Sequence, residues 1–102
     1  MKRKPGLSRE EFERRYAEHG AVMARAAIGL LSYTQYPGRA MGVGDIYTSA
    51  ESQCYDALSV YVFASAECAA QTTLLPEVIA DSESFIDFAS MITLPVTPRQ
   101  VV

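Results

Sequence analysis

The first third of the chain has the hydrophobic pattern of an amphipathic α-helix. Between residues 8 and 27, apolar side chains recur every three or four positions, the spacing of one helix face. Ser8 is a suitable N-cap with Glu11 three residues later, and Gly29 is a suitable stop. The pattern therefore predicts a helix over residues 8–27. Within an arc of about 80°, its apolar face carries Phe12, Tyr16, His19, Met23 and Ala26.

Three later segments have the composition of β-strands. In residues 30–36, LLSYTQY, β-branched and aromatic residues alternate with small polar ones. Residues 57–64, ALSVYVFA, are apolar on both faces, which is typical of a strand in the middle of a sheet. Residues 88–96, FASMITLPV, are predicted to form the last strand.

The segments between these strands contain helix and turn signals. Residues 37–56 form a long connection with four glycines or prolines. After the second strand, Ser65 is a suitable cap for a helix over about residues 66–74, and Pro76 can begin a further helical turn that ends near residue 82.

The predicted order is helix, strand, long connection, strand, helix and strand, which is an α+β chain of one domain, residues 1–102. With one strand in front, the order would be βαββαβ, the ferredoxin-like split βαβ motif. Only MKRKP precedes the first helix, and it has no apolar alternation. We therefore expect the first strand to be missing or truncated, so that the last strand lacks its usual neighbour.

Composition and charge narrow the classes of partner. The chain is 49% apolar and 21% charged, with a net charge of −3, which argues against nucleic acid as a partner. No apolar run approaches the roughly 20 residues that span a bilayer, and the start lacks the apolar core of a signal peptide. We therefore expect no membrane contact. The two cysteines, Cys54 and Cys68, form no C-x-x-C motif, so we expect free thiols and a cytoplasmic location.

The sequence has no motif for a metal or an organic cofactor. It contains a single histidine, and its carboxylates do not have ligand spacing. The glycines of PGRAMGVGD do not lie between a strand and a helix, which argues against a nucleotide-binding loop. We expect any chemistry to proceed without a metal or a cofactor.

Four segments in order resemble one family. The opening KRKPGLSREEFERRYAEHGAVMARA resembles that of EthD-domain proteins, in which K-R-K-P-G is followed by S-x-E-E-F, an aromatic residue and E-H. LLSYTQY, CYDALSVYVF and PEVIADSESFID resemble three later segments of the same family. The resemblance extends from Lys2 to Thr97.

The resemblance implies a ferredoxin-like fold that forms a homodimer. Two sheets pack face to face as a dimeric α/β barrel, and each half holds a pocket between its sheet and helices. Members with assigned roles are similar to fungal polyketide-tailoring enzymes, namely decarboxylases of anthraquinone-type acids, dehydratases and cyclases. The chain departs from the family at Gly20 and Ala21, where a small residue and proline are usual, and at Ala57, where glycine is common.

The candidate site residues centre on His19, which matches the family's histidine. An imidazole titrates near neutrality and can act as general acid or base, although a histidine on an apolar helix face is often only a packed residue. Tyr33 and Gln35 face the same side of a strand and can hydrogen-bond a carbonyl or enolate of a substrate. The alternative is that Tyr33 is a core residue and Gln35 lies at a sheet edge. Asp56, in the family's Tyr-Asp pair, can orient His19 or cap a turn. We therefore expect the catalytic residues to be His19, Tyr33 and Asp56. The residues expected to bind substrate are Tyr16, Met23, Gln35, Phe63 and Phe85.

Two classes of function fit these residues. The first is a cofactor-free, lyase-type enzyme that decarboxylates, dehydrates or cyclises an aromatic polyketide, with a cofactor-independent oxygenase as a variant. The second is a non-catalytic dimer that binds an apolar ligand. A site open to solvent, with a second polar group within hydrogen-bond reach of His19, favours the enzyme. A sealed and dry histidine favours the binding module.

Overall fold

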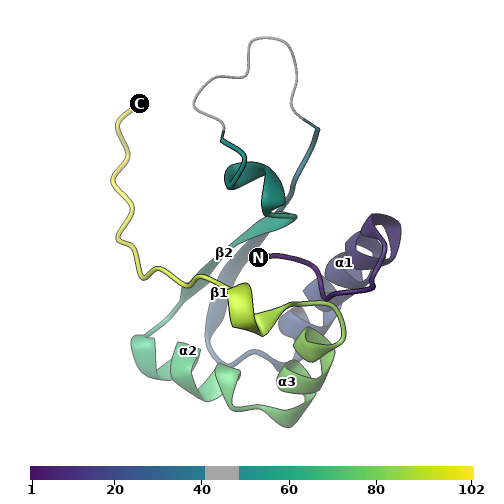
Figure 1. Cartoon of the computed structure of the whole chain (residues 1–102). Coiled ribbons are helices and arrows are strands. Elements are labelled where there is room, and N and C mark those ends of the chain that lie inside the picture. Colours follow the sequence, from purple (N-terminus) through teal and green to yellow (C-terminus); the bar gives the residue numbers. More distant parts are fainter. Residues whose placement is uncertain (41–48) are drawn as a thin grey trace.

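The computed structural model describes residues 1–40 and 49–102, and this part of the chain forms an α+β fold (Figure 1). Two strands run through the centre of the view, α2 and α3 lie below them, and α1 lies to the right. Most of the long connection between the strands, residues 41–48, lies outside the described residues. The elements are α1 (Arg9–Ala26), β1 (Leu30–Pro37), β2 (Ala57–Phe63), α2 (Ala66–Thr73) and α3 (Pro76–Glu83), with 3₁₀ turns at Ser52–Cys54 and Phe88–Ser90.

The first helix confirms the sequence prediction to within one residue at each end. The Ser8 hydroxyl accepts a hydrogen bond from the Glu11 amide at 3.1 Å, so the predicted cap is formed. After the helix, Gly29 has a φ of 63°, and a Cβ there would lie 2.6 Å from the Cys68 sulfur. Glycine is therefore required at this reversal both for its backbone conformation and for its lack of a side chain.

The two described strands form an antiparallel pair in which Tyr33 faces Tyr61 and Gln35 faces Ser59. Side chains of these positions point toward α1, since the Gln35 amide donates to the Tyr16 carbonyl of α1 at 2.6 Å and the Ser59 hydroxyl lies 2.9 Å from that of Tyr16. The opposite face of the pair is turned away from the helices. It exposes Tyr36, Leu58, Val60 and Val62.

The N-terminal residues lie between β2 and the segment that follows α3. The Met1 carbonyl accepts a hydrogen bond from the Asp56 amide at 2.9 Å, and the Lys4 amide donates one to the Phe85 carbonyl at 2.9 Å. Arg3 forms an isolated antiparallel bridge with Ile86. Residues 1–4 thus occupy the position of the end of a first strand, although only one bridge is formed there.

The prediction of a last strand over residues 88–96 is wrong. Phe88–Ser90 is a 3₁₀ turn, and residues 91–102 run without strand pairing within the described part of the chain (Figure 1). An extended segment becomes a strand only when a neighbour satisfies its backbone groups. The neighbouring position is occupied only by residues 1–4, so residues 91–96 have no strand beside them.

The second strand, β2, was expected in the middle of a sheet, but it has fewer backbone neighbours than a central strand. Beyond β1, its one backbone neighbour in the described residues is Met1, at Ala57. Its apolar side chains on the face away from the helices are consequently exposed. The core lies on the other side, where α1, the start of β2 and the end of α3 meet. Its buried cluster is Phe12, Tyr16, Ala57, Phe85 and Ile86, against which Met1 and Leu7 pack.

Candidate functional site

The histidine of α1 is paired with a carboxylate of α3. Nδ1 of His19 lies 2.6 Å from Oδ2 of Asp81. The His19 side chain is 3% exposed and that of Asp81 is 30% exposed, so the pair lies at the edge of the core. An ionised carboxylate can only accept a hydrogen bond, so we assign the proton of the neutral ring to Nδ1, which donates a hydrogen bond to Asp81.

The second ring nitrogen of His19 is available. Nε2 makes no hydrogen bond in the described part of the chain. No fully buried side-chain nitrogen or oxygen in that part lacks a partner, so the exposed remainder of His19 must include Nε2. The arrangement is therefore an imidazole oriented through one nitrogen, with the other nitrogen at the small exposed part of a side chain that is 3% exposed.

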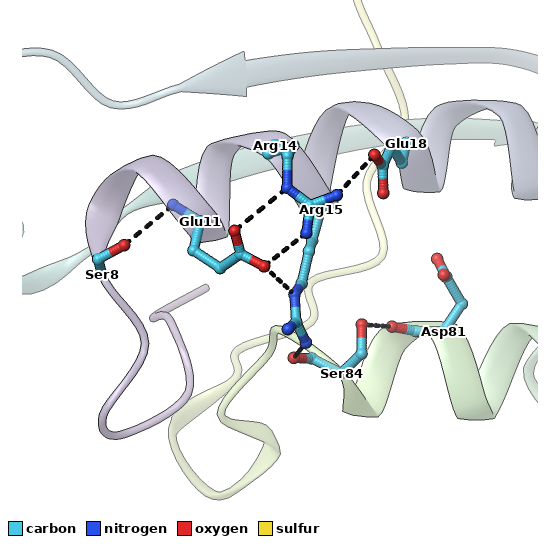
Figure 2. Close-up of polar contacts among 7 residues, drawn as sticks. All are labelled: Ser8, Glu11, Arg14, Arg15, Glu18, Asp81 and Ser84. Atoms are coloured by element: carbon cyan, nitrogen blue, oxygen red, sulfur yellow. Dashed lines mark hydrogen bonds and ion pairs between the residues drawn. The ribbon is translucent and has the colours of Figure 1, made fainter.

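Asp81 is held in place by a network between α1 and α3 (Figure 2). The Ser84 hydroxyl donates to the Asp81 carbonyl at 2.6 Å, and Arg15 donates to the Ser84 carbonyl at 2.7 Å. Arg15 in turn donates from Nε to the Glu11 carboxylate at 2.9 Å. The bond from Arg15 to the Ser84 carbonyl joins α1 to the end of α3, close in sequence to Asp81.

Aromatic rings surround the imidazole. The ring centroids of His19 and Phe85 are 5.3 Å apart, and those of His19 and Tyr33 are 6.2 Å apart in an edge-on arrangement. Tyr33 stacks on Tyr61 at 4.3 Å. These rings limit the access of water to the pair, which strengthens electrostatic interactions there.

A polar cluster lies beside the imidazole on the helix-facing side of the strands. The Gln35 amide donates to the Tyr16 carbonyl at 2.6 Å and to the Tyr33 hydroxyl at 2.9 Å. The hydroxyls of Tyr16 and Ser59 are 2.9 Å apart. Burial is the main cause that raises the pKa of both Tyr16 and Tyr61, so these phenols remain protonated donors at neutral pH.

An open groove of about 570 Å³ adjoins this cluster, between the second half of α1 and β1. Small residues of the helix form one wall, and the strand forms the other. Gly20 follows His19 directly, and Tyr33 and Gln35 belong both to the polar cluster and to the groove. The groove is lined by Gly20, Ala24, Ala27, Leu30, Leu31, Ser32, Tyr33, Thr34 and Gln35.

The structure brings most of the predicted site residues together. The rings of Tyr33 and Phe85 contact that of His19. Tyr16 and Gln35 contact these two residues in turn. The other two predicted substrate-binding residues lie at its margins. Met23 is buried one turn further along α1, and Phe63 lies beyond Tyr61, at 6.2 Å between ring centroids.

Asp56 lies elsewhere, and the role of orienting His19 falls to Asp81. The Asp56 carboxylate accepts hydrogen bonds from the Arg3 amide at 2.8 Å and from the Arg3 side chain at 3.1 Å. It also lies 3.7 Å from Arg9. Asp56 thus anchors the N-terminal residues to the start of α1. The one sequence signal for Asp81 is the PEVIADSESFID segment, which contains it and resembles the family. That this segment lies next to α1 is decided by the fold.

Comparison with known families identified one family. The EthD domain matches residues 4–89, a range that includes His19, Tyr33, Gln35 and Asp81. The chain belongs to the EthD domain family. Searches of curated proteins and of solved structures gave no match.

Three further properties concern the described residues as a whole. No group of three or more histidine, cysteine, aspartate or glutamate side chains is placed to hold a metal ion there. None of the described helices has the length and apolar character needed to cross a membrane. Cys54 and Cys68 are free thiols, as the sequence predicted.

Proposed function

We propose that this EthD-domain chain is a cofactor-free tailoring enzyme that decarboxylates, dehydrates or cyclises an aromatic polyketide. His19 is the general acid and base. The observation that carries the proposal is the His19–Asp81 pair, in which Nδ1 is 2.6 Å from the carboxylate and Nε2 is free to meet a ligand.

The geometry fits proton transfer at Nε2. Asp81 holds the ring in one orientation and stabilises the imidazolium that forms when Nε2 accepts a proton. In a cyclisation or dehydration, Nε2 would take a proton from a phenol or an activated carbon. In a decarboxylation, a protonated Nε2 would give its proton to the carbanion that remains after CO₂ leaves.

Tyr33 is the best placed donor for a developing oxyanion. Its oxygen accepts a hydrogen bond from the Gln35 amide at 2.9 Å and lies 3.4 Å from the Ser59 hydroxyl, so a ligand oxyanion would compete with Ser59 for the phenol proton. Gln35 therefore acts through Tyr33, because both amide hydrogens are engaged by Tyr16 and Tyr33.

The second candidate is a non-catalytic module that binds an apolar ligand. The observation in its favour is the 3% exposure of His19, which is close to a sealed side chain. In this case the Asp81 contact would serve to satisfy a buried nitrogen, and the surrounding rings would form a packed wall.

We also propose that the protein acts as a homodimer in the reducing cytoplasm. Tyr36, Leu58, Val60 and Val62 leave an apolar face on the strand pair, opposite the helices, and a second copy placed face to face would cover it. The free thiols of Cys54 and Cys68 suit a reducing compartment.

The function is tested by pairing a binding assay with a turnover assay. Aromatic polyketide carboxylic acids are incubated with the wild type, His19→Ala, Asp81→Asn and the control Glu77→Gln, whose exposed ion pair with Arg25 also joins α1 to α3. We expect His19→Ala to lower turnover by roughly 10²–10⁴-fold. Asp81→Asn should lower it less, and Glu77→Gln should match the wild type. Binding without turnover in the wild type would favour the module. Turnover that survives in a folded His19→Ala variant would remove His19 from the mechanism.

A further inference from the structure

Ser59 lies at the centre of the polar cluster, on β2 and directly opposite Gln35 of β1. Its hydroxyl oxygen lies 2.9 Å from the hydroxyl of Tyr16 and 3.4 Å from that of Tyr33. A serine hydroxyl has one proton and can turn it toward either neighbour. The half-buried Ser59 is therefore the point at which the phenols of α1 and β1 meet.

The groups at the two ends of this cluster fix the direction of the hydrogen bonds between them. The Leu58 carbonyl can only accept, so the Tyr16 hydroxyl donates to it at 2.9 Å. Because its one proton is used there, Tyr16 accepts from Ser59, and Ser59 accepts from Tyr33. At the other end, the Gln35 amide donates to the Tyr33 oxygen. In the free protein, the phenol proton of Tyr33 therefore points to Ser59.

The two hydrogen bonds of Ser59 differ in strength. The distance to Tyr16 is close to the roughly 2.7–2.8 Å that is usual between two hydroxyls, whereas the 3.4 Å to Tyr33 is longer. The bond from Tyr33 is therefore the one that a stronger acceptor would replace. When Tyr33 donates to an oxyanion, its own oxygen gains negative charge and becomes a better acceptor than the oxygen of Tyr16.

We propose that Ser59 is a positioning residue that acts through Tyr33: when an aromatic oxyanion binds, the Ser59 hydroxyl turns from Tyr16 to Tyr33 while the Tyr33 hydroxyl turns to the ligand. This inference rests on the role of Tyr33 in the proposed function. The Tyr33 oxygen then accepts from both Ser59 and Gln35, which makes its O–H a stronger donor. Tyr16 keeps its bond to the Leu58 carbonyl, so no hydroxyl proton loses its acceptor.

The change needs only the hydroxyl protons to move, because the side chains around them are held. The Tyr33 ring stacks on Tyr61 at 4.3 Å between centroids. The Gln35 amide is fixed to α1 by its 2.6 Å bond to the Tyr16 carbonyl. A rotation of two O–H groups within this frame costs little reorganisation, which is the condition for effective stabilisation of an oxyanion.

The test measures the binding of 4-nitrophenolate, an aromatic oxyanion, and of nitrobenzene, which has the same ring without the oxyanion. The whole chain carries Ser59→Ala, Ser59→Thr, which restores a hydroxyl, or Tyr33→Phe. The control Thr73→Val removes a hydroxyl that donates to a backbone carbonyl of α2 at 2.7 Å. At mildly alkaline pH the probe is ionised, while burial raises the pKa of Tyr16 and Tyr61 and keeps them protonated. Calorimetry gives the affinities, and visible absorption reports the hydrogen bond to the phenolate.

We expect Tyr33→Phe to weaken phenolate binding by about tenfold or more, and Ser59→Ala to weaken it by about fivefold. Ser59→Thr should stay within about twofold of the wild type, as should Thr73→Val. Nitrobenzene binding should not change in any variant. The band of the bound phenolate should move to longer wavelength in Ser59→Ala, because a weaker hydrogen bond stabilises the charge on its oxygen less. A serine that only packs the cluster would affect both probes alike.

Two results would overturn the proposal, and they differ in what they leave standing. Phenolate binding that Ser59→Ala leaves unchanged or strengthens, while Tyr33→Phe weakens it, would remove Ser59 and keep Tyr33 as the oxyanion donor. A wild type that binds phenolate no better than nitrobenzene would remove both roles. If urea denaturation shows that Ser59→Ala is unfolded, Ser59→Cys gives the same comparison, because its thiol is a weak donor. Turnover at His19 is measured separately by the assays above.

Discussion

At the scale of single residues, the site depends on how one imidazole is held. His19 has one nitrogen oriented by Asp81 and a second nitrogen that makes no hydrogen bond in the described residues. Tyr33 is oriented in the same manner by Gln35. In both cases a neighbouring polar group fixes the orientation of the ring, which in the proposed function prepares the group for proton transfer or hydrogen-bond donation before a ligand arrives.

The tautomer of His19 can be tested without a substrate, because this is the one histidine in the chain. Nitrogen-15 NMR of the neutral ring should show Nδ1 protonated in the wild type. In Asp81→Asn the amide can donate to Nδ1, so the population should move toward the Nε2-protonated form. Asp87→Asn is the control, since Asp87 caps the last 3₁₀ turn. An unchanged ring in Asp81→Asn would show that the carboxylate does not fix the tautomer.

At the scale of elements, the site depends on the packing of α1 against its neighbours. The Glu11, Arg15 and Ser84 network fixes α3 against α1. At the other end of α1, the reversal at Gly29 leads the chain into β1, and the Ile28 amide donates to the Thr72 hydroxyl of α2 at 2.9 Å. The positions of α3 and β1 relative to α1 place Asp81 and Tyr33 on either side of His19.

Replacement of Gly29 should be costly, and Gly6 provides the matched control. Both have positive φ, but a Cβ at Gly29 meets the Cys68 sulfur at 2.6 Å, whereas one at Gly6 has no atom within 4 Å. Gly29→Ala combines backbone strain with overpacking, so we expect it to lower the free energy of unfolding by about 2–4 kcal/mol. Gly6→Ala should cost about 1 kcal/mol. Urea denaturation measures both, and equal losses would show that Cys68 moves aside freely.

The ion pairs of α1 should contribute to the acid dependence of stability. Hydrogen bonds from Arg14 and Arg15 hold the pKa of Glu11 at about 2, below the ordinary 4.5. A depressed pKa in the folded state means that this contribution is complete above pH 4.5 and is lost as the pH falls toward 2. Melting temperatures across this interval should fall less steeply for Glu11→Gln than for the wild type. Glu67→Gln, on α2, should keep the wild-type slope, and an equally steep slope in Glu11→Gln would contradict the expectation.

At the scale of the whole molecule, apolar surface is unevenly distributed. The core occupies the helix side of the strands, while the other face and the segment after residue 90 expose large apolar side chains. Contiguous apolar surface of this kind marks an interaction site in a soluble protein. The proposed second copy would cover the strand face.

A charge on the apolar face of the strand pair should weaken the proposed dimer. Val60→Lys, at the middle of that face, should raise the dimer dissociation constant by about tenfold or more because the lysine ammonium would be desolvated in the interface. Leu74→Lys is the control, since Leu74 is exposed at the junction of α2 and α3 on the helix side. Light scattering distinguishes the two. A dimer that tolerates Val60→Lys and dissociates with Leu74→Lys would place the interface on the helices.

The sequence by itself determined the local elements and pointed to the residues at the centre of the candidate site. Helix α1, strands β1 and β2 and the two later helices lie within about two residues of the predicted bounds. Their signals are local, since caps, turn residues and side-chain periodicity act within a few residues of one another. His19, Tyr33 and Gln35 were found from the same periodicities, because each faces the side of its element that packs against the rest of the chain.

Only the tertiary structure decided which distant groups meet. Asp81 lies 62 residues from His19, and no local pattern distinguishes it from Asp56, which instead binds Arg3. The strand pattern of residues 88–96 was present in the sequence, but a strand also requires a neighbour, and residues 1–4 provide too little of one. Pairing between distant segments depends on the whole arrangement of the chain, so the partner of His19 and the outcome of the last segment could not be obtained from local pattern alone.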